Sequence, residues 1–232
     1  MEASSLTLPP TVPAPSTTTI TPETVTITPS ILYFGTPVVL LTTRNEDGTA
    51  NLAPISSAWA LGHTIVLGLG PDGQTGRNLL AGRSEVALGL PHPGLWPQVE
   101  LLGGLTGRPP APEDPRGHVT HERDKFGAAG LTPVASELIT PPRVGECPLQ
   151  LEARAAAVRH DAGGEFLIVE ASVLRVHAAP GLVVPGTQYV DPAAWSPLIY
   201  NFRHYFGLGP ELGHSSRSQT PRSPHPQGLG RV

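Results

Sequence analysis

The sequence predicts a mainly β protein, a barrel or sandwich with helical inserts. Short runs rich in β-branched and aliphatic residues recur along the chain, and turn signals separate them. Few long helical periods interrupt these runs, which favours strands that close on one another over alternating strand and helix layers. The length of 232 residues suits one domain with flexible ends better than two very small domains.

Two groups of runs carry the strand prediction. Near the N-terminal side, three strands at hairpin distances are expected to form a meander, in which Asp47-Gly48 is a turn signal. Nearer the C-terminus, the stretch "DAGG" separates two alternating runs and predicts a hairpin. The expected strands are residues 36–44, 50–61, 63–70, 85–91, 147–161 and 164–178.

Helices are expected in three places between and after these strands. Residues 73–84 read as a short helix with Thr75 as a plausible N-cap. Prolines and glycines interrupt residues 93–142, where short helices are expected over 95–102 and 119–128. The aromatic segment 195–209 is expected to be a helix followed by a loop.

The run 50–61 is unusual for a core strand because its middle is polar. Pro54 removes a ladder donor, and Ser56 and Ser57 stand where branched apolar residues would pack better. Together with exposed backbone at a bend, the two hydroxyls offer a place to hold a polar ligand.

Both ends of the chain are rich in Thr, Pro and Ser and lack a helical or strand period. Residues 1–28 and 213–232 are therefore expected to be disordered tails around a folded domain over 29–212. The N-terminal stretch lacks the basic and apolar regions of a secretory signal, and no run approaches the length of a membrane span. A cytoplasmic protein without a membrane partner is expected.

Composition excludes several classes of function. The net charge is −4 and the basic residues are scattered, which argues against a nucleic-acid partner. The single cysteine, Cys147, excludes an intrachain disulfide and cysteine-based metal clusters, and it lies in an apolar run, where a buried thiol is usually inert.

The stretch "GLGPDG" (68–73) matches the glycine pattern of a dinucleotide-binding loop. Three features argue against that reading. The preceding strand belongs to a hairpin series, Pro71 removes a backbone donor, and no acidic residue ends the following strand. A turn that leads into a helix explains the glycines better.

The start of that helix is a candidate anion site. Thr75, Arg77 and Asn78 place a hydroxyl, a cation and an amide in one turn, where backbone N–H groups attract anions. A capped surface helix is the alternative. His118, His121 and Glu122 hint at a metal site, but their charged surroundings suit a solvated segment, and no metal is expected.

The ordered pieces resemble the flavin-reductase-like, FMN-binding split-barrel family, with flavoredoxin-type members nearest. They are "PVVLLTTRNEDGTANLAPISSAWALG", "TGRNLLAGRSEVALGLP", "GECPLQLEARA" and "FLIVEASVLRVH", within residues 31–206. The resemblance implies a six-stranded split β-barrel that forms a homodimer and binds FMN near the subunit interface.

The resemblance also implies site residues. The strand beside the isoalloxazine ring and ribityl chain maps to Asn51, Ala53, Pro54, Ser56, Ser57 and Ala58, and the phosphate turn maps to Thr75, Arg77 and Asn78. Gln74 stands where many members have lysine. Arg77 would therefore have to neutralise more of the negative charge of the phosphate. Aromatic residues that could cover the ring or contact substrate are Tyr200, His204 and Tyr205.

The implied function is an NAD(P)H-dependent flavin reductase, in which nicotinamide passes a hydride to flavin N5. Reduced flavin would then serve an acceptor, and a partner monooxygenase is one candidate. No acid–base pair is needed, because the cofactor carries the chemistry. Two alternatives remain: an FMN-binding module with a specialised redox or purely binding role, and a structural dimer that has lost flavin.

Overall fold

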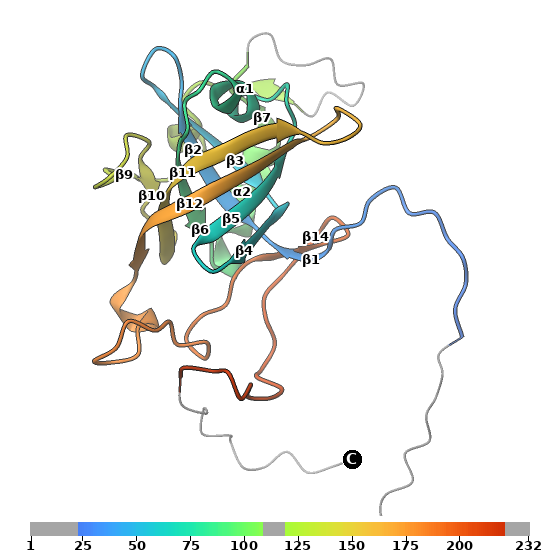
Figure 1. Ribbon diagram of the computed structural model, residues 1–232, viewed down its shortest axis with the longest axis vertical. Coiled ribbons are helices and arrows are strands. Elements are labelled where there is room, and N and C mark those ends of the chain that lie inside the picture. Colours follow the sequence, from blue (N-terminus) through green and yellow to red (C-terminus); the bar gives the residue numbers. More distant parts are fainter. Residues whose placement is uncertain (1–22, 109–118, 221–232) are drawn as a thin grey trace, which may run out of the picture. The chain divides into compact units, whose positions relative to one another are not determined.

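The computed structural model describes residues 23–108 and 119–220 (Figure 1). The chain divides into two compact units, residues 1–30 and 31–232, and every described helix and strand lies in the second. The tails predicted to be disordered lie largely outside the described residues. Their described parts, 23–28 and 213–220, carry no helix or strand.

An antiparallel sheet of seven strands forms the body of the second unit (Figure 1). In order across the sheet, the strands are β3 (Ala50–Ile55), β2 (Val39–Arg44), β6 (Glu85–Leu90), β11 (Leu149–His160), β12 (Leu167–Ala178), β5 (Thr64–Leu69) and β4 (Ala58–Leu61). The predicted hairpin is confirmed, because β11 pairs with β12 on either side of the stretch 161–164.

The polar middle of the run 50–61 is where the sheet closes on itself. The run is not one strand: β3 pairs with β2, β4 pairs with β5, and these pairs lie at opposite edges of the sheet. Ser56 and Ser57 carry the chain from one edge to the other, and Gly68 N donates to Ser57 O at 2.8 Å. The predicted three-strand meander is therefore wrong, because one uninterrupted strand cannot pair with both edges.

Smaller elements surround this barrel. They are the sheet of β1 (Phe34–Pro37), β13 (Ile199–Asn201) and β14 (His204–Phe206), the pairs β9 (Pro133–Val134) with β10 (Arg143–Val144) and β7 (Leu105–Thr106) with β8 (Thr120–His121), the helices α1 (Gln74–Leu80), α2 (Trp96–Gly103) and α3 (Lys125–Ala129), and the 3-10 turns η1 (Pro93–Leu95) and η2 (Pro180–Leu182).

Two helix predictions are confirmed and two need correction. Helices do occupy parts of 73–84 and 95–102 as α1 and α2. The expected helix over 119–128 is wrong in its first half, which includes β8; α3 begins only after Asp124, whose carboxylate accepts from Gly127 N at 2.9 Å.

The segment 195–209 is a hairpin rather than a helix. Tyr200 pairs directly with Tyr205 across β13 and β14, and β1 supplies a third strand. Cross-strand aromatic pairs stabilise such a hairpin, and the two rings lie 5.1 Å apart between centroids. Partners distant in sequence therefore override the local helical appearance.

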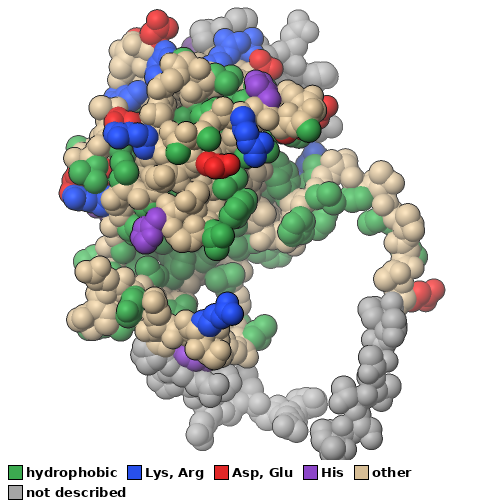
Figure 2. Space-filling model, in the orientation of Figure 1, with side chains coloured by type: hydrophobic (Ala, Val, Ile, Leu, Met, Phe, Trp, Pro, Cys, Tyr) green, Lys and Arg blue, Asp and Glu red, His purple; other side chains and the backbone are tan. Residues whose placement is uncertain are grey.

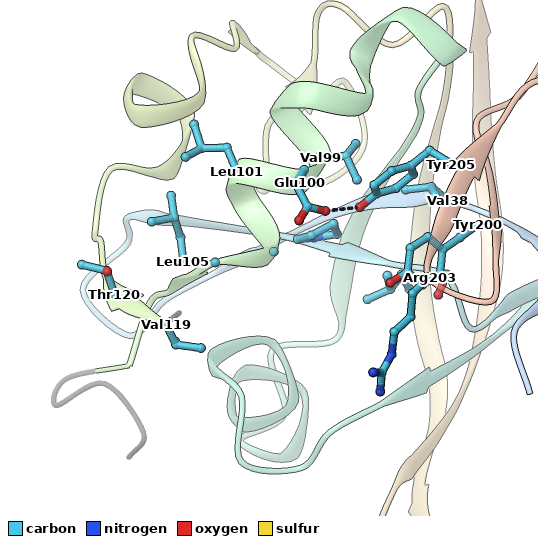
Figure 3. Close-up of a pocket in the computed structure, with 15 residues that line it drawn as sticks. Val38, Val99, Glu100, Leu101, Leu105, Val119, Thr120, Tyr200, Arg203 and Tyr205 are labelled. Carbon is cyan, nitrogen blue, oxygen red and sulfur yellow. Dashed lines mark hydrogen bonds between the residues drawn. The ribbon is translucent and has the colours of Figure 1, made fainter. Parts of the chain in front are cut away.

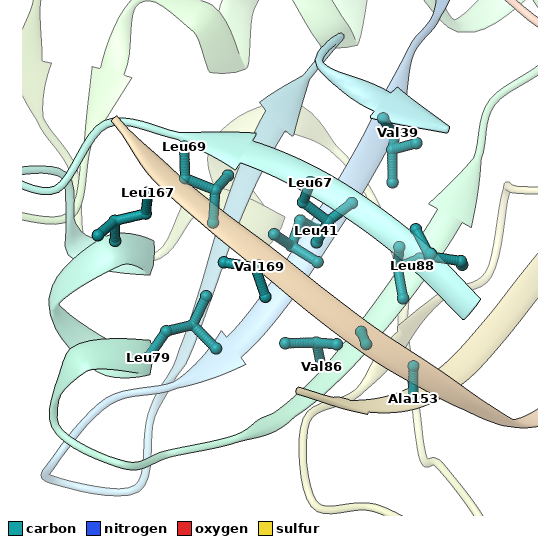
Figure 4. Packing of buried hydrophobic residues seen from close by; sticks show 13 residues of the cluster. Val39, Leu41, Leu67, Leu69, Leu79, Val86, Leu88, Ala153, Leu167 and Val169 are labelled. Carbon is teal, nitrogen blue, oxygen red and sulfur yellow. The ribbon is translucent and has the colours of Figure 1, made fainter. Parts of the chain in front are cut away.

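Two apolar cores lie on the two faces of the sheet. One fills the barrel, where Leu41, Leu67, Val86 and Val169 meet Leu79 from α1 (Figure 4). The other packs the outer face of the sheet against α2 and α3. Strand β2 serves both, because alternate residues point to opposite faces, so Leu41 belongs to the first core and Leu40 to the second.

Charged side chains of both signs are interspersed on the face shown in Figure 2. In residues 23–108 and 119–220, no helix combines the length and the apolar character that crossing a membrane requires.

Candidate functional site

A cavity of about 1000 Å³ opens beside the point where the barrel closes (Figure 3). One wall is the end of β3 and the residue after it, Pro54, Ile55 and Ser56. The second wall is α2 with the following β7, joined by β8, and the third is the β13–β14 hairpin with Tyr200 and Tyr205. The volume is at the upper end of the range of about 300–1,000 Å³ that is usual for small-molecule sites.

The structure brings four of the predicted site residues to this cavity: Pro54, Ser56, Tyr200 and Tyr205. The predicted neighbours Ala53, Ser57 and Ala58 flank the wall without lining it, and Ala58 is buried in β4. His204 is exposed on the hairpin and does not line the cavity.

Tyr205 fastens the hairpin to α2, since its hydroxyl donates to Glu100 Oε2 at 2.9 Å (Figure 3). Burial and this hydrogen bond to a carboxylate raise the pKa of Tyr205 above its ordinary value. Tyr205 therefore stays a neutral donor at physiological pH and serves as an anchor rather than as an acid or base.

Asn51 and Thr75 join β3 to α1 in the interior. Asn51 Nδ2 donates to Thr75 Oγ1 at 2.9 Å, and both side chains are buried. Thr75 is therefore not the N-cap; Gly73 holds that position without a side-chain hydrogen bond. Asn51 Oδ1 is buried and has no hydrogen-bond partner among the described residues, and Asn51 itself does not line the cavity.

Asn78 holds α1 against β2 from inside the protein. Its Nδ2 donates to Thr43 Oγ1 at 2.9 Å and to Asn45 Oδ1 at 3.0 Å, while its Oδ1 accepts from Gln74 Nε2 at 3.0 Å. Asn78 is 1% exposed, so its side chain positions the helix. Arg77, its neighbour in sequence, points to solvent.

The comparisons with known proteins identify the family. A model of the flavin reductase like domain matches residues 31–209. The chain belongs to this flavin reductase-like family. The uncharacterized protein YdfE of Bacillus subtilis (strain 168) is 44% identical over 192 residues, which cover 82% of this chain and 92% of YdfE.

Two solved structures show the same fold. Flavoredoxin of Desulfovibrio vulgaris (Miyazaki F) has a TM-score of 0.69 at 19% identity, covering 85% of this chain and all of flavoredoxin (100%). A putative flavin reductase with a split barrel domain from Shewanella frigidimarina NCIMB 400 has a TM-score of 0.62 at 18% identity. The match covers 79% of this chain and 87% of that reductase. The flavin reductase-like split barrel predicted from sequence is thus confirmed, but the described sheet has seven strands where six were expected.

The dinucleotide-binding alternative for 68–73 fails on topology. Strand β5 pairs antiparallel with both β4 and β12, so no parallel βαβ unit surrounds these glycines. Gly68 instead allows close approach: a Cβ there would lie 3.0 Å from Ser57 Cβ.

Two further basic residues of the flavin reductase-like domain have surroundings that were not predicted from sequence, although neither lines the cavity. Arg108 follows β7, and its Nη1 donates to Asp72 O, 3.5 Å away in the loop before α1. Lys125, the only lysine, is 4% exposed in α3, and burial lowers its pKa to about 8. The sequence holds no local signal for either, because their neighbours in space are distant along the chain.

The remaining candidates do not line the cavity or lie beyond the described residues. His118 lies outside the described residues, whereas His121 and Glu122 are in β8 and just after it. Within the described residues, no group of His, Cys, Asp and Glu is suited to hold a metal ion.

We expect Cys147 to be inert towards thiol reagents in the folded protein. It is buried, and burial together with the charge of Glu146 raises its thiol pKa from the ordinary 9.0 to about 12. The thiolate is the reactive form, so labelling at pH 8 should be many times slower in buffer than in urea. Equal rates in the two solutions would contradict the buried placement.

Proposed function

We propose that the protein is an NAD(P)H-dependent flavin reductase that binds FMN. One observation carries the proposal: the barrel-closing segment Pro54–Ser56, expected beside the flavin, forms a wall of a cavity large enough for a flat ring and a second molecule. Family membership supports the same class of activity.

The residues present fit a flavin. The buried, unpartnered Asn51 Oδ1 is an acceptor, and an imide N–H or a ribityl hydroxyl of a flavin is a donor of the kind it lacks. The rings of Tyr200 and Tyr205 line the cavity and offer apolar faces to a planar group.

Each group of predicted site residues has its own proposed role. Ser56 lines the cavity and would orient the ring, with Ser57 next to it in the chain. Thr75 and Arg77 do not line the cavity; we propose that they meet the phosphate at the start of α1, and Asn78 fixes that helix against β2. A bound flavin would supply the redox chemistry, the transfer of reducing equivalents from reduced nicotinamide to another acceptor. The chain itself would need to bind and orient the reactants and to exclude water.

We further propose a homodimer, with a monooxygenase as a candidate acceptor partner. Edge strand β4 exposes Trp59 and Leu61, and Phe34 is likewise exposed on β1. Exposed apolar residues of this size on an unpaired edge favour association. Sedimentation equilibrium of the protein is expected to give twice the monomer mass.

Arg77→Ala is expected to weaken FMN binding by about 1–3 kcal/mol, as loss of a charged hydrogen bond would. Riboflavin, which lacks the phosphate, is the matched ligand and should bind both proteins equally. Fluorescence titration measures both affinities. Equal weakening for riboflavin, or no change for FMN, would place the phosphate elsewhere.

Nicotinamide oxidation tests the activity. The protein should oxidise NADH or NADPH only when FMN is present, with a rate that saturates in each substrate. Tight FMN binding without nicotinamide oxidation would replace the reductase by a flavin module with another redox role. If the protein binds no flavin, the remaining alternative is a structural dimer that has lost flavin.

A further inference from the structure

The β13–β14 hairpin places a cation at the cavity that no described group neutralises. Arg203 occupies the turn of the hairpin and lines the cavity, and its side chain extends away from Tyr205 (Figure 3). In residues 23–108 and 119–220, no carboxylate forms an ion pair with Arg203. Glu100, the one acidic residue among the described lining residues, is already bonded to Tyr205.

The backbone that presents Arg203 is strained. Phe202 and Arg203 have φ values of 45° and 67°, and among the described residues they alone are non-glycine residues with positive φ. A two-residue hairpin turn of this kind favours Asn-Gly, because a side chain there costs about 1–2 kcal/mol per residue. Strain of this kind persists where surrounding contacts impose it and is concentrated at functional sites.

The surroundings hold this turn in place. Phe202 N donates to Tyr33 O at 2.6 Å, while the rings of Tyr200 and Tyr205, from the two strands of the hairpin, contact each other in a tilted arrangement. The position of Arg203 is thus set by contacts on the hairpin and on the segment before β1. The barrel-closing segment with Ser56 lines the same cavity.

We propose that Arg203 binds an anionic oxygen group, a phosphate or a carboxylate, of the substrate that exchanges electrons with the flavin. The inference rests on the proposed function, because it places this substrate between the hairpin and the flavin-binding wall. The anion has two possible sources, the phosphates of a nicotinamide dinucleotide and the carboxylate of an aromatic acceptor. A guanidinium suits either, since its paired donors match both groups.

Steady-state kinetics of Arg203→Gln separate the two sources. NADH is varied first, and then a neutral benzoquinone and its carboxylated analogue are each varied as acceptor, always with saturating FMN. If the anion belongs to the dinucleotide, KM for NADH should rise about ten- to hundredfold with both acceptors. If it belongs to the acceptor, only KM for the carboxylated quinone should rise. Arg203→Lys should recover part of either loss.

Two further variants guard the interpretation. Arg203→Gly relieves the strained turn, so thermal stability should hold or increase while KM rises as in Arg203→Gln. Arg159→Gln, at an exposed arginine on β11 outside the cavity lining, should leave every KM unchanged.

The outcomes distinguish this inference from the proposed function. Wild-type protein that binds FMN and oxidises NADH, together with Arg203 variants whose KM values all stay within twofold, overturns the role of Arg203 alone. Wild-type protein that neither binds FMN nor oxidises a nicotinamide overturns both.

Discussion

Replacing Glu152 by alanine is expected to lower the free energy of unfolding by about 3–5 kcal/mol, as removal of one partner from a buried ionic cluster does. Glu152 lies in β11 and is 0% exposed. Its Oε1 accepts from Glu137 N at 2.9 Å and lies 2.8 Å from His177 Nε2, and its Oε2 accepts from Leu138 N at 2.7 Å. Arg143 Nε stands 3.6 Å from Oε1.

The substitution would therefore remove the hydrogen-bond or charge partner of several groups at once. Two backbone donors of the loop before β10 would lose their acceptor, and the guanidinium of Arg143 would lose its counter-charge. Urea unfolding at neutral pH measures the change. The matched variant Glu170→Ala removes an exposed carboxylate from neighbouring β12 and should change stability by less than about 0.5 kcal/mol. Similar losses in both variants would mean that Glu152 does not organise this loop.

Gly76→Ala is expected to lower stability by about 1–3 kcal/mol and to weaken FMN binding at least tenfold. A Cβ on Gly76 would lie 2.4 Å from Gly70 O and 2.9 Å from Pro71 O. Both atoms belong to the backbone, so either α1 or the loop before it must move. That movement would displace Thr75, and with it the contact to Asn51.

Helix propensity alone would predict that this substitution stabilises the protein, because alanine favours a helix over glycine by about 1 kcal/mol per residue. Gly103→Ala in α2 is the matched control for stability, because no atom beyond its chain neighbours and the backbone of its own helix lies within 4 Å of a Cβ built there. It should leave stability unchanged or increase it. A stabilised Gly76→Ala protein with normal FMN affinity would show that close packing at α1 does not shape the site.

Local sequence was sufficient to predict most of the strands and one wall of the cavity. Pro54 and Ser56 interrupt an apolar run, and that interruption predicted a ligand-facing bend. Its structural meaning was not predictable, because β3 and β4 look continuous until their partners β2 and β5 are known. The bend turned out to be the closure of the barrel.

The opposite wall depends on contacts between residues far apart in sequence. Tyr205 bonds Glu100 across 105 positions, and β13 pairs with β1 from near the other end of the chain. Neither contact leaves a local pattern, so the segment read as a helix and Arg203 went unnoticed. Asn78 was assigned to the phosphate for its amide, whereas the structure shows both amide ends bonded to protein groups.

Flavin binding by the purified wild-type protein tests the central claim most directly. FMN is titrated into protein freed of bound flavin, and its fluorescence and visible absorption are followed, with Gly76→Ala as the comparison. We predict saturable binding at one FMN per chain, with a shifted absorption band for wild type and an affinity at least tenfold weaker for Gly76→Ala. Wild-type protein that leaves the FMN spectrum and fluorescence unchanged would contradict the account.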